Sequence, residues 1–262
     1  MTIVLIAGLC YLAAVLLLVR GVGVATQRGF QPWHAPAFAG TALHGGYHVV
    51  AWRAAQGADL HFFAALSLVS LGMALLTLLV GARGRMAPLG VVVFPLAASA
   101  LLAYANAGHS APEDLAWQLQ LHAWCALLAY ATLAIAALLA MMLWLQERAL
   151  RRRRIHGWLR ALPPLTELES LLFRTIAVGF ALLTATLLTG VVFVEDLFAQ
   201  HLVHKTALSV LSWLAFGGLL LGRWRLGWRG AVAVRWTLVA MTLLVLAFFG
   251  SKFVLELVLG RS

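Results

Sequence analysis

The stretch LVHKTALSVLSWLAFGGLLLGRWRLGWRG, residues 202–230, is an apolar segment with different polar residues at its two ends. His204 and Lys205 stand at its start. Its end is a basic turn that contains Arg223, Trp224, Arg225, Trp228 and Arg229. Because the apolar part is about 20 residues long, it predicts a membrane-spanning helix. Such a helix has a direction, with a candidate ligand at one membrane face and arginines at the other.

The whole chain has the composition of a membrane protein. Of its 262 residues, 63% are hydrophobic and 11% are charged, and the mean hydropathy is +0.94. A soluble domain carries more charge than this. The net charge of +10 does not indicate nucleic-acid binding, because the basic residues lie between the apolar runs, as topology signals do. We therefore expect contact with membrane lipid and none with nucleic acid.

Apolar runs recur along the chain and predict eight membrane-spanning helices. Their predicted ranges are 2–24, 36–54, 61–82, 87–105, 116–146, 168–194, 203–222 and 231–258. The second range is the least certain span, because it holds two histidines and two adjacent glycines. No segment has the composition of a soluble domain. The expected fold is therefore an all-α polytopic membrane bundle, forming a single integral-membrane domain over residues 1–262.

The basic residues predict the orientation of this bundle. Thirteen of the nineteen Lys and Arg residues fall in the odd-numbered connections between spans, including the run RRRR at 151–154. The even-numbered connections hold five acidic residues: Asp59, Glu113, Asp114, Glu195 and Asp196. Since Lys and Arg concentrate in cytoplasmic loops, we expect the odd-numbered connections in the cytoplasm and both termini outward.

The cysteines exclude two kinds of redox protein. Cys10 and Cys125 lie inside apolar runs, and the sequence has no CxxC or CxxCH motif. A thiol oxidoreductase of the usual kind needs the first motif, and a covalent c-type cytochrome needs the second. We interpret both cysteines as small core residues.

Seven of the nine histidines fall in the outer half of the predicted bundle. Four of them lie within a predicted span or at its mouth: His44, His48, His122 and His204. Ionisable side chains inside spans are costly and usually face an interior site, and imidazole is a strong ligand for iron, copper and zinc. The alternative is that these histidines are interfacial or hydrogen-bonding groups without a metal.

The histidine pattern favours haem over a bare metal ion. A zinc or copper site needs several clustered ligands, often with a carboxylate or thiolate, and no acid accompanies the intramembrane histidines. Haem needs only one or two axial imidazoles and an apolar slot. Four aromatic residues lie near the histidines and could line such a slot or form the interfacial belt: Tyr47, Trp52, Trp117 and Trp124. The predicted cofactor is haem b.

We predict that His122 is one axial ligand and that its partner is His48 or His204. His122 and His48 lie at matching depth, each about two turns below the outer surface. His44 and His48 are four residues apart and share one helical face, so they cannot clamp one iron between them. His44 would then serve a second haem or hydrogen-bond within the bundle.

Lys252 in the stretch GSKFVLE, residues 250–256, has two possible roles. It lies four residues before Glu256, so the two side chains could form an intrahelical ion pair that makes their burial tolerable. In the functional alternative, Lys252 binds a haem propionate near the outer surface.

Three segments resemble the CcsA/HemX-type cytochrome c assembly proteins. Residues 117–133, WQLQLHAWCALLAYATL, are similar to the family segment W-x-x-x-x-H-x-x-x-x-L-L-[SA]-Y. Residues 167–190 are similar to the next family helix, which contains G-F-x-L-L-T and ends in T-G. Residues 204–230 are similar to the following family span, which ends in G-W-R-G. The chain length and the GSKFVLE ending resemble the small YpjD-like inner-membrane proteins of this family.

The resemblance implies haem binding at the outer membrane face. The family handles haem there, typically in a loop W-x-W-D-P-K-E flanked by two histidines, and His122 takes the place of the first. The corresponding loop, residues 194–206, has no tryptophan and no D-P. Lys205 matches the lysine of the family loop, and His204 occupies the position of the family proline. The second histidine would align near Gly222 and is absent. His204 or His48 would replace it as a ligand.

The expected function is to hold or relay haem b near the outer face of the bacterial inner membrane, as a multi-pass protein that is not an enzyme. Other cytochrome biogenesis or membrane proteins would be its partners. Two alternatives remain open. One is a transmembrane b-type electron carrier to or from quinol, which would prefer bis-histidine sites at two depths. The other is a cofactor-free transporter or assembly scaffold.

Overall fold

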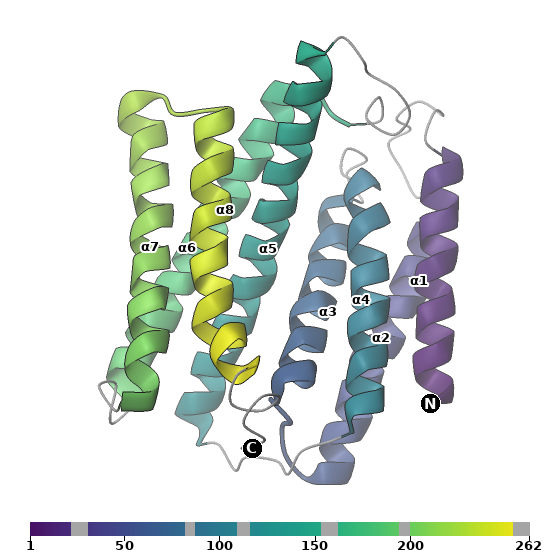
Figure 1. The fold of residues 1–262 in the computed structure, drawn as a ribbon. Helices are drawn as coiled ribbons and strands as arrows, with labels where there is room; N and C mark the ends of the chain where they lie inside the picture. Colours follow the sequence, from purple (N-terminus) through teal and green to yellow (C-terminus); the bar gives the residue numbers. More distant parts are fainter. Residues whose placement is uncertain (22–30, 82–86, 109–115, 153–161, 194–199, 254–262) are drawn as a thin grey trace. The chain divides into compact units, whose positions relative to one another are not determined.

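The structure, a computed structural model, describes residues 1–21, 31–81, 87–108, 116–152, 162–193 and 200–253. These residues form long α-helices and contain no β-strand (Figure 1). The helices are α1 (Thr2–Gly21), α2 (His34–Ala55), α3 (Phe62–Gly81), α4 (Ala87–Ala107), α5 (Trp117–Arg151), α6 (Leu165–Phe193), α7 (Gln200–Leu226) and α8 (Ala231–Val245), followed by the π-helical turn η2 (Leu246–Gly250). The all-α prediction is confirmed, and each predicted span corresponds to one helix.

Among the described residues, seven helices are long and apolar enough to cross a membrane. The exception is α2, whose histidines and glycines lower its hydropathy. With 22 residues, α2 is about 33 Å long, close to the thickness of the hydrocarbon core. Its polar side chains Thr41, His44 and His48 are buried. The second predicted span is therefore a helix whose polar face is covered by protein.

The described helices form two compact units. Unit 1 contains α1 to α4, and unit 2 contains α5 to α8 with η2. In unit 1 each helix packs on its neighbours in the sequence, and α1 also packs on α4, so that the four helices close a ring. Unit 2 has the same arrangement, closed by α5 on α8. The single domain over residues 1–262 stays a prediction.

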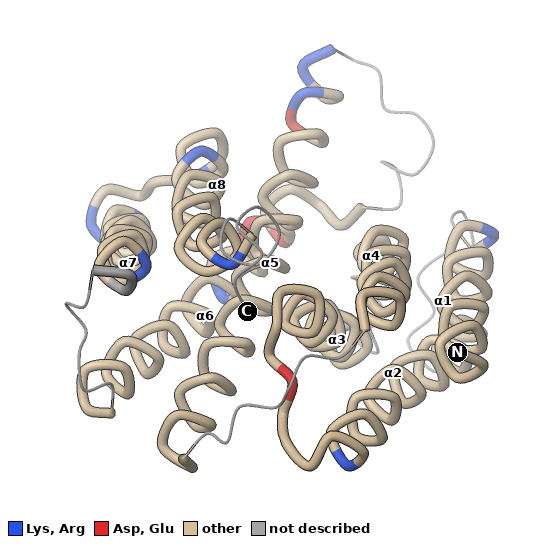
Figure 2. The backbone as a smooth tube through the Cα atoms, turned by 60° about the horizontal axis from the view of Figure 1, so that its bottom comes forward, with Lys and Arg blue, Asp and Glu red and all other residues tan. Residues whose placement is uncertain are grey.

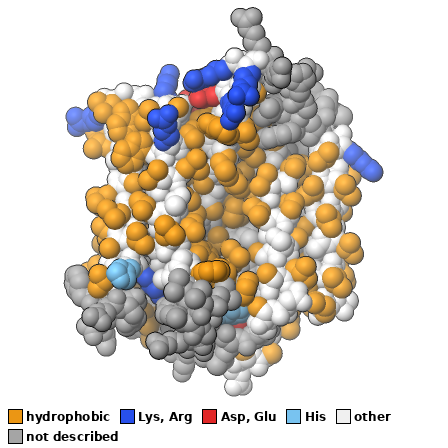
Figure 3. Space-filling view, viewed as in Figure 1, with side chains coloured by type: hydrophobic (Ala, Val, Ile, Leu, Met, Phe, Trp, Pro, Cys, Tyr) orange, Lys and Arg blue, Asp and Glu red, His pale blue; other side chains and the backbone are white. Residues whose placement is uncertain are grey.

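The surfaces of the units match a lipid environment. Lys and Arg residues lie near the helix ends (Figure 2), and apolar side chains cover the middle of the helices in view (Figure 3). Large exposed side chains on α6 and α7 include Leu188, Val191, Leu214 and Leu221. Water would disfavour so much contiguous apolar surface, whereas acyl chains accept it. The chain is therefore a polytopic membrane protein, as predicted.

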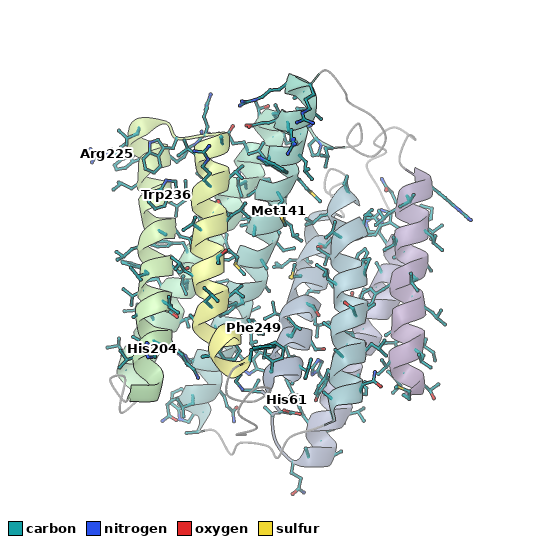
Figure 4. The ribbon with its side chains drawn as sticks, in the orientation of Figure 1. His61, Met141, His204, Arg225, Trp236 and Phe249 are labelled. Atoms are coloured by element: carbon teal, nitrogen blue, oxygen red, sulfur yellow. The ribbon has the colours of Figure 1, made fainter. Side chains whose placement is uncertain are left out.

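The basic turn between α7 and α8 is tied to the start of α6. The Arg223 guanidinium donates to Glu169 Oε1 at 2.8 Å and lies over the Phe173 ring. Arg229 Nε lies 3.7 Å from the same carboxylate oxygen. His204 and Arg225 mark opposite ends of α7 (Figure 4). The direction predicted for this segment, with histidine and arginine at opposite ends, is thus present in the helix.

The predicted eighth span, 231–258, is helical as far as it is described. Its regular α8 passes into the π-helical turn η2, and residues 254–258 lie outside the described part. A π-helical turn interrupts the regular i to i−4 hydrogen-bond ladder. The buried Tyr130 hydroxyl of α5 donates to the Leu244 carbonyl at 2.5 Å. Tyr130 therefore joins α5 to the end of α8.

Candidate functional site

His44 and His48 meet at one serine in the interior of unit 1. The Nε2 atoms of both imidazoles lie 2.9 Å from the Oγ of Ser67, which comes from α3. All three side chains are at most 1% exposed. The two rings are stacked, with centroids 5.6 Å apart. The prediction that they share one helical face is confirmed, because both reach the same hydroxyl.

Tyr11 of α1 adds a third helix to this cluster. Its hydroxyl lies 3.2 Å from His44 Nδ1, and its ring stacks on Phe94 of α4. Neither Tyr11 nor Phe94 is exposed. The polar cluster therefore joins α1, α2 and α3, and the Phe94 ring of α4 packs on its Tyr11.

A second polar group lies where α2 ends and α3 begins. His61 Nδ1 is 2.6 Å from Asp59 Oδ1, and the Tyr104 hydroxyl donates to Asp59 Oδ2 at 3.5 Å, the outer limit for a hydrogen bond. The Tyr104 ring stacks on His48, with centroids 4.8 Å apart. Tyr104 thus connects the interior histidines to the Asp59–His61 pair at the predicted outer end of unit 1.

Sequence reasoning missed Tyr11, Ser67 and Tyr104 as members of this site. Each is a single polar residue in an apolar helix, and such residues are common in membrane helices. The sequence did indicate that Ser67 and His48 could meet, because Ser67 lies five residues into α3, at a depth close to that of His48. The pairing of helices that joins them could not be read from one sequence.

His122 lies in unit 2, near the start of α5. Its Nδ1 is 3.2 Å from the Oγ1 of Thr189, near the end of α6. The next residue, Gly190, leaves room for the ring, since a Cβ there would lie 3.2 Å from His122 Cε1. Trp117 and Phe193 are neighbours at the same end of these helices, with ring centroids 6.1 Å apart. The closing T-G of the family-like segment therefore packs on the predicted haem ligand.

The hydrogen bonds of Thr189 favour one tautomer of His122. The single hydroxyl proton of Thr189 is directed to main-chain carbonyls, with Oγ1 2.8 Å from Ala185 O and 3.0 Å from Thr186 O. With the Thr189 proton on these carbonyls, Oγ1 accepts from His122, and this arrangement has the imidazole proton on Nδ1. The lone pair of His122 is therefore on Nε2, the atom that a metal-binding histidine offers when its other nitrogen donates to a neighbour.

The remaining predicted site residues are less enclosed. The side chain of His204 is exposed near the start of α7 (Figure 4), and that of Lys205 is half-buried beside it. Lys252 is half-buried after η2, with Nζ 5.5 Å from the Phe248 ring centroid. Its proposed partner Glu256 lies outside the described residues, so the ion pair stays a prediction.

The histidines fall into two groups, one in each unit. His44 and His48 belong to unit 1, whereas His122 and His204 belong to unit 2. In the described part of the chain, no three His, Cys, Asp or Glu side chains converge as a bare metal site would require. A haem site needs only one or two axial donors. His122, whose Nδ1 lies against Thr189 and whose Cε1 lies against Gly190, can offer Nε2 as one such donor.

Comparison with known proteins identifies one family. The family model described as cytochrome C assembly protein matches residues 37–259. The inner membrane protein YpjD of Escherichia coli is 31% identical over 198 residues, 73% of each chain. An uncharacterized 28.8 kDa protein of Azospirillum brasilense is 41% identical over 144 residues, which cover 54% of this chain and 53% of that relative. Protein HemX of Brevibacillus brevis is 27% identical over 131 residues, about half of each chain.

No solved structure gives a significant match to this chain. The family match covers most of the sequence, including all three segments that resemble the family and the helices that carry His44, His48, His122 and His204. The chain therefore belongs to the cytochrome c assembly family, and it is a multi-pass protein of the bacterial inner membrane.

Proposed function

We propose that this protein binds haem b near the outer face of the inner membrane and holds or relays it during cytochrome c assembly. The observation that carries the proposal is the orientation of His122. Its Nδ1–H is held by Thr189, so its Nε2 lone pair is available to an iron atom. The cytochrome assembly partners of such a protein would be other membrane proteins of the same process.

His204 is the proposed second ligand. It belongs to the same unit as His122, and both lie at the end of unit 2 that is predicted to face outward. Its exposure suits a ligand that exchanges when haem enters or leaves. His48, the other predicted partner, already has its Nε2 hydrogen-bonded to Ser67 in the interior of unit 1. Loss of that bond would oppose iron binding at His48.

The residues around His122 would bind and orient the ligand rather than transform it. Thr189 fixes the tautomer of the imidazole, and Gly190 leaves room for the ring. Trp117 and Phe193 provide an apolar wall at the same end of α5 and α6. The iron, when bound, supplies one-electron redox chemistry. We propose no bond-forming catalysis by the protein.

The test is the haem content of the purified full chain, measured by an optical spectrum in the oxidised and reduced states. Four single variants are compared with the wild type: His44→Ala, His48→Ala, His122→Ala and His204→Ala. We expect loss of haem in His122→Ala, a shifted Soret band or loss in His204→Ala, and near wild-type spectra in the other two. Full haem content in His122→Ala would contradict the proposed ligand. A colourless wild-type protein supplied with haem would favour a cofactor-free scaffold.

Lys252 is the proposed partner of a haem propionate. It lies after η2, and a cationic side chain near the surface stabilises a carboxylate. Lys252→Met is expected to weaken haem retention, whereas Glu256→Gln has little effect. Equal retention in both variants would remove the propionate role and leave the intrahelical ion pair as the explanation of Lys252.

A further inference from the structure

The turn that joins α7 to α8 places two guanidinium groups on one carboxylate oxygen. Arg223 Nη1 lies 2.8 Å from Glu169 Oε1, and Arg229 Nε lies 3.7 Å from the same atom. Because one carboxylate balances only one of the two cations, these three side chains keep a net positive charge. The Glu169 side chain is 13% exposed, whereas that of Arg229 is 72% exposed. The surplus charge therefore lies at the surface, on Arg229.

Arg225 adds a second exposed charge beside this group. Its guanidinium lies over the Trp224 ring, 4.5 Å from the ring centroid. A guanidinium that lies over a ring keeps N–H donors for an acceptor beside it, because five such donors surround its edge. Among the described residues, no carboxylate oxygen lies within 4.0 Å of Arg225. Its charge is therefore open to an anion from outside the protein.

Tryptophan side chains indicate the depth of these arginines in the membrane. Trp224 is 74% exposed and Trp236 is 40% exposed. Trp236 stacks on Trp228 of the turn, with ring centroids 5.8 Å apart. Trp236 and Arg225 lie near the same end of unit 2 (Figure 4). Since indole rings prefer the boundary between acyl chains and headgroups, the arginines of the turn lie at the level of the lipid headgroups.

The charge balance at this end of unit 2 favours an anionic partner. Residues 147–152 of α5, 165–169 of α6 and 223–235 contain seven arginines and three glutamates, which leaves four positive charges. The end of α5 adjoins the turn, because a Cβ on Gly230 would lie 2.8 Å from Glu147 Oε1. This end is predicted to face the cytoplasm, where the membrane surface carries anionic lipids. The charge of the protein here is complementary to that surface.

We propose that Arg225 and Arg229 bind the phosphodiester of an anionic glycerophospholipid, with Trp224 against its glycerol and upper acyl chains. Guanidinium groups bind phosphate oxygens through charge-assisted hydrogen bonds in a forked geometry. Glu169 is a positioning residue, since it holds Arg229 from the protein side. A zwitterionic headgroup brings its own cation to the same arginines, which repel it. The site therefore selects a headgroup with a net negative charge, and it does not depend on haem at His122.

Native mass spectrometry of the full chain, released from detergent micelles with added lipid, tests this site. The probes are palmitoyl-oleoyl phosphatidylglycerol and phosphatidylethanolamine with the same acyl chains. We expect the wild type to bind phosphatidylglycerol more tightly, because only this headgroup has a net negative charge. Equal affinity for the two lipids would overturn the proposal. Displacement of phosphatidylglycerol by inorganic phosphate at equal concentration would also overturn it, since the site would then be one for free phosphate.

Single variants locate the site on the turn. Arg225→Gln and Arg229→Gln are each expected to weaken phosphatidylglycerol binding about fivefold, the effect of one cation near an anionic surface. Arg225→Lys should keep most of the preference, because lysine keeps the charge. Arg20→Gln is the matched control, since Arg20 is exposed at the end of α1 and is predicted to lie at the same membrane face. Equal weakening in Arg20→Gln and Arg225→Gln would leave only a general effect of surface charge and contradict the site.

The result for Arg225→Gln is decisive. This substitution removes no ion pair among the described residues, whereas Arg229→Gln also loses the contact with Glu169. Arg225→Gln should therefore fold as the wild type does, which its circular dichroism and its haem content would show. Wild-type preference for phosphatidylglycerol in Arg225→Gln would overturn the proposal, whatever the result for Arg229→Gln.

Discussion

The imidazole of His122 in α5 and the hydroxyl of Thr189 in α6 are joined by a hydrogen bond of 3.2 Å between Nδ1 and Oγ1, across 67 positions in the sequence. Because the Thr189 proton is directed to main-chain carbonyls, the bond orients His122 with its lone pair on Nε2. The contact between α5 and α6 thus orients a histidine that lies in an apolar segment. Four predictions follow from this and from neighbouring contacts.

Thr189→Val is expected to weaken haem binding. Valine has a similar shape but no hydroxyl, so His122 Nδ1 loses its acceptor and the ring loses its fixed tautomer. Removal of such a partner from a metal-binding histidine typically costs about 10–100-fold in affinity. Haem titration followed at the Soret band measures the change. Thr175→Val is the matched control, since the Thr175 hydroxyl bonds to Leu171 O in its own helix.

Gly190→Val is expected to displace His122. A Cβ at Gly190 would lie 3.2 Å from His122 Cε1, and the two additional methyl groups of valine would enter the space of the ring. Haem content should fall, and Gly190→Ala should show a smaller effect. Gly218→Ala on α7 is the control, because a Cβ there meets nothing within 4 Å. Equal haem content in Gly190→Val and the wild type would show that the ring position does not matter for binding.

Glu169→Gln is expected to destabilise unit 2 by about 1–2 kcal/mol. This is less than a buried charge-assisted hydrogen bond contributes, because water screens the Arg223 guanidinium, whose side chain is 32% exposed. Glu169 contacts both Arg223 and Arg229, so its loss leaves the basic turn without its carboxylate. Unfolding in mixed detergent micelles measures the change. Glu147→Gln should cost less, since its partner Arg151 is 78% exposed and 3.9 Å away.

Cysteine labelling is expected to confirm the predicted orientation. The parent for the test replaces Cys10 and Cys125 with alanine. Asn106→Cys, at the exposed end of α4, should react with a membrane-impermeant reagent added outside the cell. Arg152→Cys, exposed at the end of α5, should react only after the membrane is opened. The reverse pattern would place His122 and His204 at the cytoplasmic face and remove the basis for haem handling outside.

The sequence by itself determined the class of the protein and the positions of its helices. Runs of apolar residues are sufficient for this, because a bilayer forces each such run to satisfy its own backbone hydrogen bonds as a helix. The same local chemistry indicated His44, His48, His122 and His204 as unusual residues. The π-helical turn η2 was not foreseen, since the contact of Tyr130 with Leu244 that accompanies it joins residues 114 positions apart.

Only the tertiary structure decided which side chains meet. Ser67 and Tyr11 carry no signal of their own in the sequence, yet both bond within the buried cluster of His44 and His48. Likewise, the tautomer of His122 depends on Thr189, a residue of another helix. Helix formation in a membrane depends on local composition, whereas helix pairing depends on the fit of side chains distant in sequence. For that reason the sequence specified the helices, and their packing specified the chemistry of the histidines.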